Sequence, residues 1–225
     1  MKQIEPEILT FRSYHAPERK QLRGLYSVLQ PFDKNLHALA LYKAFSHDKD
    51  GLDWTYLPYG PFYSESSFFN WVDMNCLTSD PLFYTVCIDE ILNPVGMLSL
   101  LKIEPNHGKI ELGHVHFSLA LQQTAASTEA LYLIMKFIFE EMGYRRLEWK
   151  CDNANERSKR SAIRLGFTFE GLFRQHWIIK SRNRDTAWYS IIDKEWFDIK
   201  VKLENWLDPN NFNKDMRQVK KLSEF

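Results

Sequence analysis

The chain has 225 residues, 29 basic against 29 acidic side chains, and a hydrophobic fraction of 44%. A chain of this length can bury a substantial core, so a single domain over 1–225 is expected. The balanced charge gives no general attraction to nucleic acid or to an anionic membrane, and no apolar run approaches the roughly 20 residues that cross a bilayer. We therefore expect a soluble protein without a nucleic-acid or membrane partner.

The N-terminal part of the chain predicts a strand followed by two helices. The run LRGLYSVLQP at 22–31 is typical of a strand closed by its proline, after which Asp33 or Asn35 can cap a helix. Residues 50–62, called the aromatic loop below, are rich in aromatic residues, Gly and Pro, which favours an ordered loop with exposed rings. A second helix is expected to begin after Ser64.

The middle of the chain predicts an antiparallel meander and then the clearest helix of the sequence. Three β-rich runs lie at 82–88, 94–103 and 109–117, with turn residues between them. A 3.6-residue apolar period follows over 127–142 and stops at Gly143.

The C-terminal part predicts a strand, a short helix, a hairpin and a last helix. The strand is expected at 145–151, and the hairpin turns at SRNR, 181–184. Strands 109–117 and 145–151 should pair in parallel, because a helix joins them as a right-handed crossover. We expect the last helix to end in a polar, frayed tail and treat 197–225 as a C-terminal helical extension.

These elements together predict a mixed fold of the α/β (α+β) type. A central, mostly antiparallel twisted sheet of about seven strands would carry helices on its faces. Three cysteines, Cys76, Cys87 and Cys151, have no CxxC spacing, and the N-terminal MKQIEPE has no hydrophobic signal region. Both features predict reduced thiols in a cytoplasmic protein, and they argue against a structural metal.

Four motifs lie in order along the chain: IELGHVHFS at 110–118, QQTAASTEA at 122–130, EWKCDNANERSKRSAIRLGFTFEG at 148–171 and NRDTAW at 183–188. In this order they resemble the GNAT superfamily, and within it the branch of ribosomal-protein N-terminal acetyltransferases. The resemblance covers most of residues 50–196. It implies an enzyme that moves an acetyl group from acetyl-coenzyme A to a primary amine, on a small molecule or a protein N-terminus, by direct transfer in a ternary complex and without a metal.

The resemblance also assigns the cofactor-binding residues. The pyrophosphate is expected at the start of the long helix, where unpaired amides and the helix dipole favour an anion. The pantetheine arm is expected where the two parallel strands splay apart, beside an N-x-x-S element. The assigned residues are Gln122, Gln123, Thr124, Ala125, Ala126 and Ser127 for the phosphate loop, Val115, His116 and Phe117 for the strand edge, and Asn155 and Ser158 for the N-x-x-S element.

Both helix starts also have a purely structural explanation. The family usually has glycines where this loop has Ala125 and Ser127, so the segment could be an ordinary helix start capped by a threonine. Asn155 is likewise a good N-cap with Ser158 at the third helical position. These alternatives stay open at the level of sequence.

Amine acetylation needs a group that takes the amine proton and a group that stabilises the departing thiolate. Glu111 is the candidate base, the alternative being a surface carboxylate paired with a lysine. Ser158 is the candidate acid, because the position at which many GNAT enzymes carry a tyrosine is Ala162. Regular alternation places Glu111 on the opposite face of its strand from His114 and His116, unless a bulge intervenes.

The aromatic loop resembles the acceptor-side lid of the family. The candidate substrate-binding residues are Trp54, Tyr56, Tyr59 and Phe62. Such rings can also plug the edge of a core without touching a ligand. Three nearby carboxylates could attract a cationic amine or be ordinary solvated charges: Asp53, Glu65 and Asp73.

Two other functions are compatible with the sequence. The missing tyrosine and the glycine-poor loop would also fit a noncatalytic coenzyme A binding or sensing module. The apolar stripe of the last helix, formed by Trp196, Ile199, Leu203 and Trp206, could instead bind a partner protein or pack on its own sheet. The acceptor and the oligomeric state, a homodimer included, are left open.

Overall fold

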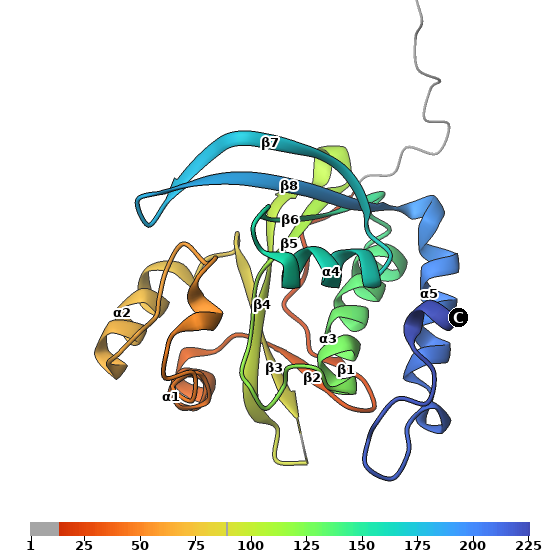
Figure 1. Ribbon diagram of the computed structural model, residues 1–225, viewed down its shortest axis with the longest axis horizontal. Coiled ribbons are helices and arrows are strands. Elements are labelled where there is room, and N and C mark those ends of the chain that lie inside the picture. Colours follow the sequence, from red (N-terminus) through yellow and green to blue (C-terminus); the bar gives the residue numbers. More distant parts are fainter. Residues whose placement is uncertain (1–13, 89) are drawn as a thin grey trace, which may run out of the picture.

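The structure, a computed structural model, describes residues 14–88 and 90–225. The expectation about a signal region at residues 1–7 lies outside the described residues. The strands are β1 (Leu22–Arg23), β2 (Val28–Pro31), β3 (Leu82–Ile88), β4 (Asn93–Glu104), β5 (Lys109–Phe117), β6 (Arg146–Asp152), β7 (Thr168–Ile179) and β8 (Arg182–Ile192). The α-helices are α1 (Lys34–Phe45), α2 (Glu65–Asn75), α3 (Ala125–Lys136), α4 (Glu156–Arg164) and α5 (Asp193–Leu207) (Figure 1).

The strands form one sheet in the order β1-β2-β3-β4-β5-β6-β8-β7. Among the described strands, β5 and β6 are the parallel pair and all other neighbours are antiparallel. The predicted mixed fold, the antiparallel meander and the parallel crossover are confirmed. The hairpin between β7 and β8 turns at Lys180 and Ser181, both with positive φ, slightly earlier than the predicted SRNR segment.

The sheet has eight strands where about seven were expected, because the predicted strand at 22–31 is split into β1 and β2. The turn between them is held by Glu129 of α3. Its carboxylate accepts hydrogen bonds from the amides of Leu25, Tyr26 and Ser27 and from the Ser27 hydroxyl, at 2.7–2.9 Å. A partner about a hundred residues away therefore decides where this strand breaks.

Helices cover the two faces of the sheet and enclose two separate cores (Figure 1). The main core lies between the sheet and α3, α4 and α5, and includes Leu100, Ile134 and Ile191. The second core lies under α1, α2 and the aromatic loop, and includes Phe45 and Phe68. The β7–β8 hairpin extends over the aromatic loop, where Lys180 Nζ donates to the Trp54 carbonyl at 2.8 Å.

The predicted helix starts are confirmed by their caps. Asp33 accepts from the amides of Asn35 and Leu36 at the start of α1, and Ser64 accepts from Ser67 N at the start of α2. The long helix begins at Ala125, two residues before the predicted start, and its last turn, Phe137–Glu141, is a π-helix.

The C-terminal tail differs from the prediction of a frayed end. The stripe of α5 packs on the main core, where Trp196, Leu203 and Trp206 are buried. After α5 the chain forms two short 3-10 turns, and Trp206 Nε1 donates to Gln218 at 2.9 Å. Leu222 returns to the main core. Burial of this stripe inside the molecule removes the reason to treat it as a partner-binding surface.

Candidate functional site

A β-bulge on β5 changes which side chains share a face of the sheet. The register with β4 shifts between Met97 and Ser99, which pair with His116 and Gly113, so β5 carries one extra residue there. His114 lies in this stretch with φ of 51°, in the left-handed region. Regular alternation therefore ends within this strand, at the bulge that the prediction had named as its exception.

The consequence of the bulge is that His116 lies on the same face as Glu111. Ile110 and Leu112 before the bulge, and Val115 and Phe117 after it, all contact the main core. His116 instead packs against Phe45 and Trp54 of the second core, with ring centroids 4.3 and 3.8 Å apart. The face away from α3 thus carries both Glu111 and His116.

The parallel strands part after a short paired stretch. β5 and β6 are in register from Lys109 and Arg146 to Leu112 and Trp149, and no pairing follows although both strands continue. The backbone of Val115–Phe117 therefore borders a gap in the sheet on its β6 side. Within this stretch the Phe117 carbonyl already accepts from Gln122 Nε2 at 2.8 Å.

Glu111 is buried at the end of a row of alternating charges. Lys150 Nζ of β6 lies 2.7 Å from Glu111 Oε2 and 2.8 Å from Glu148 Oε2. Arg146 continues the row, binding Glu148 and, across the sheet, Glu170 of β7. Burial raises the pKa of Glu111, and the hydrogen bond and charge of Lys150 act to lower it.

Two features of Glu111 suit it to proton transfer. Its other oxygen, Oε1, makes no hydrogen bond to any residue in the described part of the chain. The lysine partner expected under the structural alternative is present, but the pair is buried and is not a surface pair. Lys150 is itself fixed by lying 3.8 Å from the Trp188 ring centroid.

The two strand histidines are neutral at physiological pH. Burial lowers the pKa of His114 to about 4 and that of His116 to about 3. His114 Nδ1 lies 2.9 Å from the Tyr59 hydroxyl, and the two rings stack. Each ring is thus held by aromatic neighbours, as expected of a structural histidine.

The aromatic loop is mostly part of the second core. Trp54 is buried, and Tyr59 and Phe62 pack against the same cluster, so the prediction of exposed rings is wrong for these three residues. Tyr56 is exposed, and its hydroxyl donates to the Ala154 carbonyl at 3.0 Å, just before α4. Among the four candidate acceptor residues, Tyr56 is the one presented to solvent beside the N-x-x-S element.

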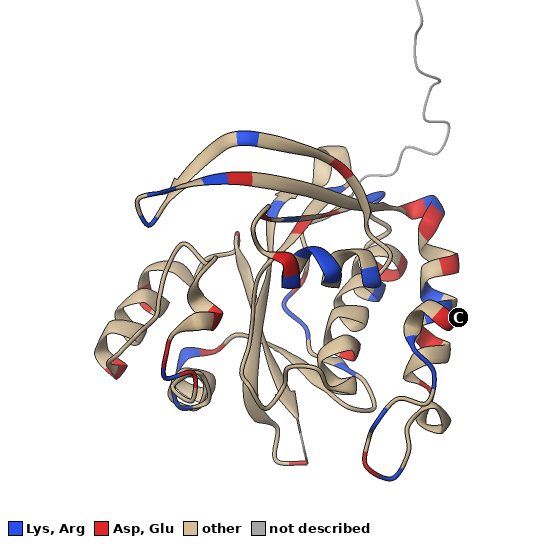
Figure 2. Ribbon diagram, viewed as in Figure 1, with Lys and Arg blue, Asp and Glu red and all other residues tan. Residues whose placement is uncertain are grey.

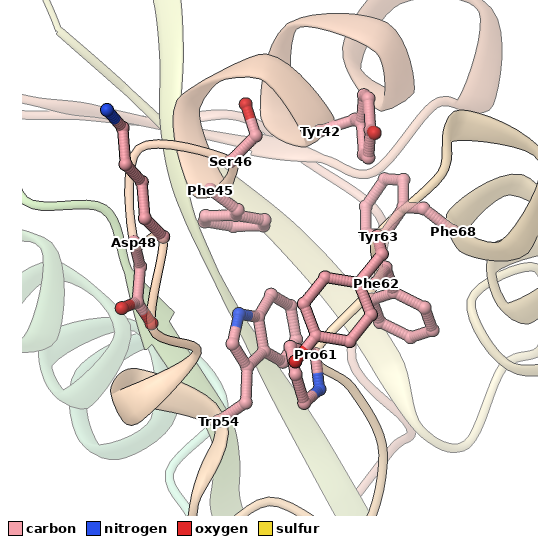
Figure 3. Close-up of a pocket in the computed structure, with 10 residues that line it drawn as sticks. Tyr42, Phe45, Ser46, Asp48, Trp54, Pro61, Phe62, Tyr63 and Phe68 are labelled. Atoms are coloured by element: carbon pink, nitrogen blue, oxygen red, sulfur yellow. The ribbon is translucent and has the colours of Figure 1, made fainter.

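A cavity of about 170 Å³ lies between the end of α1 and the aromatic loop (Figure 3). Its aromatic wall includes Phe45, Trp54 and Phe62, and Asp48 lies at one side. Both Asp48 oxygens accept backbone amides of the loop, from Leu52 and from the next residue. Neither Glu111 nor Ser158 lines this cavity, so it lies apart from the predicted catalytic residues.

The predicted phosphate loop leads into α3 as expected. Thr124 is the N-cap, and its hydroxyl accepts from Ser127 N at 3.1 Å. Gln123 takes a left-handed backbone, with φ of 60°. The first amides of a helix have no partner within the helix, so those of Ala125 and Ala126 are donors beside small side chains.

Gln122 belongs to a cluster that sequence reasoning missed. Its amide donates to Asp53 at 2.7 Å, and Arg157 of α4 binds both Gln122 and Asp53. Asp53 is therefore not a free charge for a cationic amine, and Asp73 is paired with Lys34. The sequence signal for this cluster is weak, because its members come from three separate segments.

The N-x-x-S element combines a helix cap with a half-buried serine hydroxyl. Asn155 Oδ1 accepts from Ser158 N at 3.0 Å, as the capping alternative requires. Ser158 Oγ accepts from Trp149 Nε1 at 3.0 Å, and the hydrogen bond of the Ser158 hydroxyl to the Cys151 thiol acts to lower the pKa of that buried thiol. Ala162 is fully buried, so the usual tyrosine position carries no polar group.

Residues 14–88 and 90–225 contain neither a candidate metal site nor a candidate membrane-spanning helix. No group of three or more His, Cys, Asp and Glu side chains there could hold a metal ion. In the same residues no helix is long and apolar enough to cross a membrane. The three cysteines are buried and unpaired.

Comparison with known proteins identifies relatives of the whole arrangement. Residues 28–168 match the sequence pattern of the acetyltransferase (GNAT) domain. A crystal structure of a GCN5-related N-acetyltransferase from Brucella melitensis is 38% identical, covers 96% of this chain and 98% of its own, and superposes with a TM-score of 0.94. A "probable acetyltransferases (GNAT family)" structure from Chromobacterium violaceum is 40% identical over 88% of this chain and 98% of its own, with a TM-score of 0.81.

A curated relative gives a more distant likeness. The "Putative ribosomal N-acetyltransferase YdaF" of Bacillus subtilis is 27% identical over 101 residues, which is 45% of this chain and 55% of that protein. The chain thus spans about half the length of this relative.

Proposed function

The chain belongs to the GNAT family of acetyltransferases, and from that premise we propose that it transfers an acetyl group from acetyl-coenzyme A to a primary amine. The observation that carries this proposal is the parting of β5 and β6 beside two helix starts, with Glu111 on one strand and Ser158 next to the other. The acceptor is a small amine or a protein N-terminus, and the name of the Bacillus relative favours the latter. Three unpaired cysteines support a cytoplasmic setting.

The described residues fit the cofactor in charge and in shape. A pyrophosphate is anionic, and the start of α3 offers free amides next to Ala125 and Ala126, with the Arg157 guanidinium nearby. The pantetheine arm needs backbone partners, and Val115 to Phe117 border the gap in the sheet. Gln122 would have to release the Phe117 carbonyl if the arm pairs there.

Bound acetyl-coenzyme A would supply an activated thioester at this gap. Glu111 would take a proton from the incoming amine, directly or through one water, using Oε1 while Lys150 keeps Oε2. Ser158, whose oxygen accepts from Trp149, would turn its hydroxyl proton from the Cys151 thiol toward the departing sulfur. Tyr56, whose hydroxyl donates to the Ala154 carbonyl, would contact the acceptor at the rim of the gap. Alignment of the two reactants can itself supply about 7–11 kcal/mol of barrier reduction in good cases.

Thermal unfolding with and without acetyl-coenzyme A, followed by thiol release with amines and N-terminal peptides, tests the proposal. We expect stabilisation by the cofactor and acceptor-dependent thiol release. Stabilisation without release from any acceptor would favour the noncatalytic coenzyme A module, for which Ala162 at the tyrosine position is the motivating observation. Absence of stabilisation would defeat both functions.

A further inference from the structure

Three residues from three segments form a closed ring of hydrogen bonds, which we call the Arg157 triad. Arg157 Nη1 of α4 donates to Asp53 Oδ1 at 3.0 Å, and Gln122 Nε2 donates to Asp53 Oδ2 at 2.7 Å. Arg157 Nη2 donates to Gln122 Oε1, which closes the ring. Each member is bonded to the other two, so the guanidinium is held in one orientation.

The arginine of this ring is held but still accessible. Its side chain is 63% exposed, whereas that of Asp53 is 12% exposed. A guanidinium has five N–H donors, and the triad uses two of them. The remaining donors are free to bind a ligand that reaches this surface.

Arg157 lies on α4, the most basic of the helices in the described part of this chain, which has no net charge. Helix α4 carries four basic residues and one acidic residue (Figure 2). Lys159 pairs with Glu156, and Arg164 lies over the Trp206 ring at 4.8 Å. Of these basic residues, Arg157 is the one that contacts Gln122, the first residue of the predicted phosphate loop.

The phosphate loop itself lacks a full positive charge. Residues 122–127 contain only uncharged side chains, and small residues other than glycine occupy its tight positions. Helix amides and the helix dipole supply partial charges, whereas a guanidinium offers a full charge and two parallel donors that match phosphate oxygens.

We propose that Arg157 is a ligand of the coenzyme A pyrophosphate, with Asp53 and Gln122 as positioning residues that aim its guanidinium. The inference rests on the proposed function, since it presupposes that coenzyme A binds this chain. The positive charge that binds the pyrophosphate would then come from a residue outside the phosphate loop. Asp53 is acidic, but in this proposal it favours anion binding. It holds the Arg157 guanidinium in place, and the triad leaves three of the five N–H donors of Arg157 free.

The test is the dissociation constant of coenzyme A and of 3′-dephospho-coenzyme A, measured by titration calorimetry at low and high salt. We expect Arg157→Ala to weaken binding of both ligands roughly tenfold or more, because a charged hydrogen-bonded contact is lost. Arg157→Lys should restore part of the affinity, since it keeps the charge and loses the fork. Asp53→Asn should weaken binding by a smaller factor. The loss in Arg157→Ala should shrink at high salt.

Arg160→Ala is the matched control. It removes the same charge from the same helix at an exposed position that is not part of the triad, so we expect about twofold weakening or less. Arg157→Gln serves if Arg157→Ala does not fold, because glutamine keeps a donor toward Asp53.

Three outcomes would overturn the inference while leaving the proposed function intact. These are wild-type affinity in Arg157→Ala or Arg157→Gln, equal losses in the Arg157 and Arg160 variants, and a loss seen with coenzyme A but not with its 3′-dephospho form. The last outcome would assign the arginine to the 3′-phosphate. Failure of the wild-type protein to bind either ligand would defeat the proposed function itself.

Discussion

Glu111 on β5 and Glu129 on α3 are both buried carboxylates, 9% and 5% exposed, but they are held by different partners. Glu129 accepts four hydrogen bonds from the turn between β1 and β2. Glu111 has one lysine partner and one oxygen without a hydrogen bond in the described part of the chain. Fixed backbone donors make Glu129 an anchor, whereas Glu111 has a single charged partner and is the carboxylate that we propose to exchange a proton.

The contrast between Glu111 and Glu129 predicts that Glu111→Gln has the largest effect, which is on the rate of acetyl transfer. The substitution keeps the shape and removes the proposed base, so acetyl transfer should fall by roughly 10²- to 10⁴-fold. Unfolding by denaturant should change little, because glutamine can still accept from Lys150. Steady-state thiol release against the best acceptor measures the effect. A variant as active as the wild type would exclude Glu111 as the base.

The second largest effect is expected on the free energy of unfolding, when Glu129 is replaced. Glu129→Ala leaves four donors without their acceptor, and we expect a loss of about 3 kcal/mol in the free energy of unfolding. Glu129→Gln keeps one acceptor and should lose less. Urea denaturation of both variants, beside Glu111→Gln, checks the contrast. Equal destabilisation by the Glu111 and Glu129 substitutions would contradict the distinction between anchor and base.

A smaller effect is expected in the pH dependence of acetyl transfer. Glu111 must be ionised to act as a base, so the rate should fall as the pH drops through its pKa. Lys150 acts to lower that pKa and burial raises it, so Lys150→Met should move the acidic limb of the rate profile to higher pH. Lys150→Arg keeps a charge and should move it less.

The smallest effect should come from Glu148→Gln. Glu148 raises the pKa of Glu111 through its charge, and it shares Lys150 with it. Removing this charge should move the acidic limb to lower pH. The acidic limb of kcat/KM, measured for the same acceptor, reports both shifts. If the acidic limb moved in the same direction in Lys150→Met and Glu148→Gln, the charged row would not control the pKa of Glu111.

Local signals were sufficient for most elements of the fold. The caps Asp33 and Ser64 mark helices that begin where predicted, because a cap contacts amides within three residues. The apolar period of α3 and the strand–helix–strand order gave the parallel pair, because a crossover of this length permits few other arrangements. The resemblance to acetyltransferases depended on the same contiguous stretch.

The candidate site was predictable only in part. Glu111 and Ser158 could be named from the sequence, but their partners Lys150 and Trp149 could not be assigned to them. The aromatic loop was expected to be exposed, yet Trp54 is buried against His116 of a distant strand. Ring burial depends on which elements pack over the loop, and composition does not contain that information.

The sequence by itself determined the helices, the meander, the parallel crossover and the family, because each depends on residues close together along the chain. Only the tertiary structure decided the bulge at His114, the break between β1 and β2 and the Arg157 triad. Each of these depends on partners from separate segments. The free energy that selects it comes from packing and hydrogen bonds between those segments, which form only when folding brings the segments together.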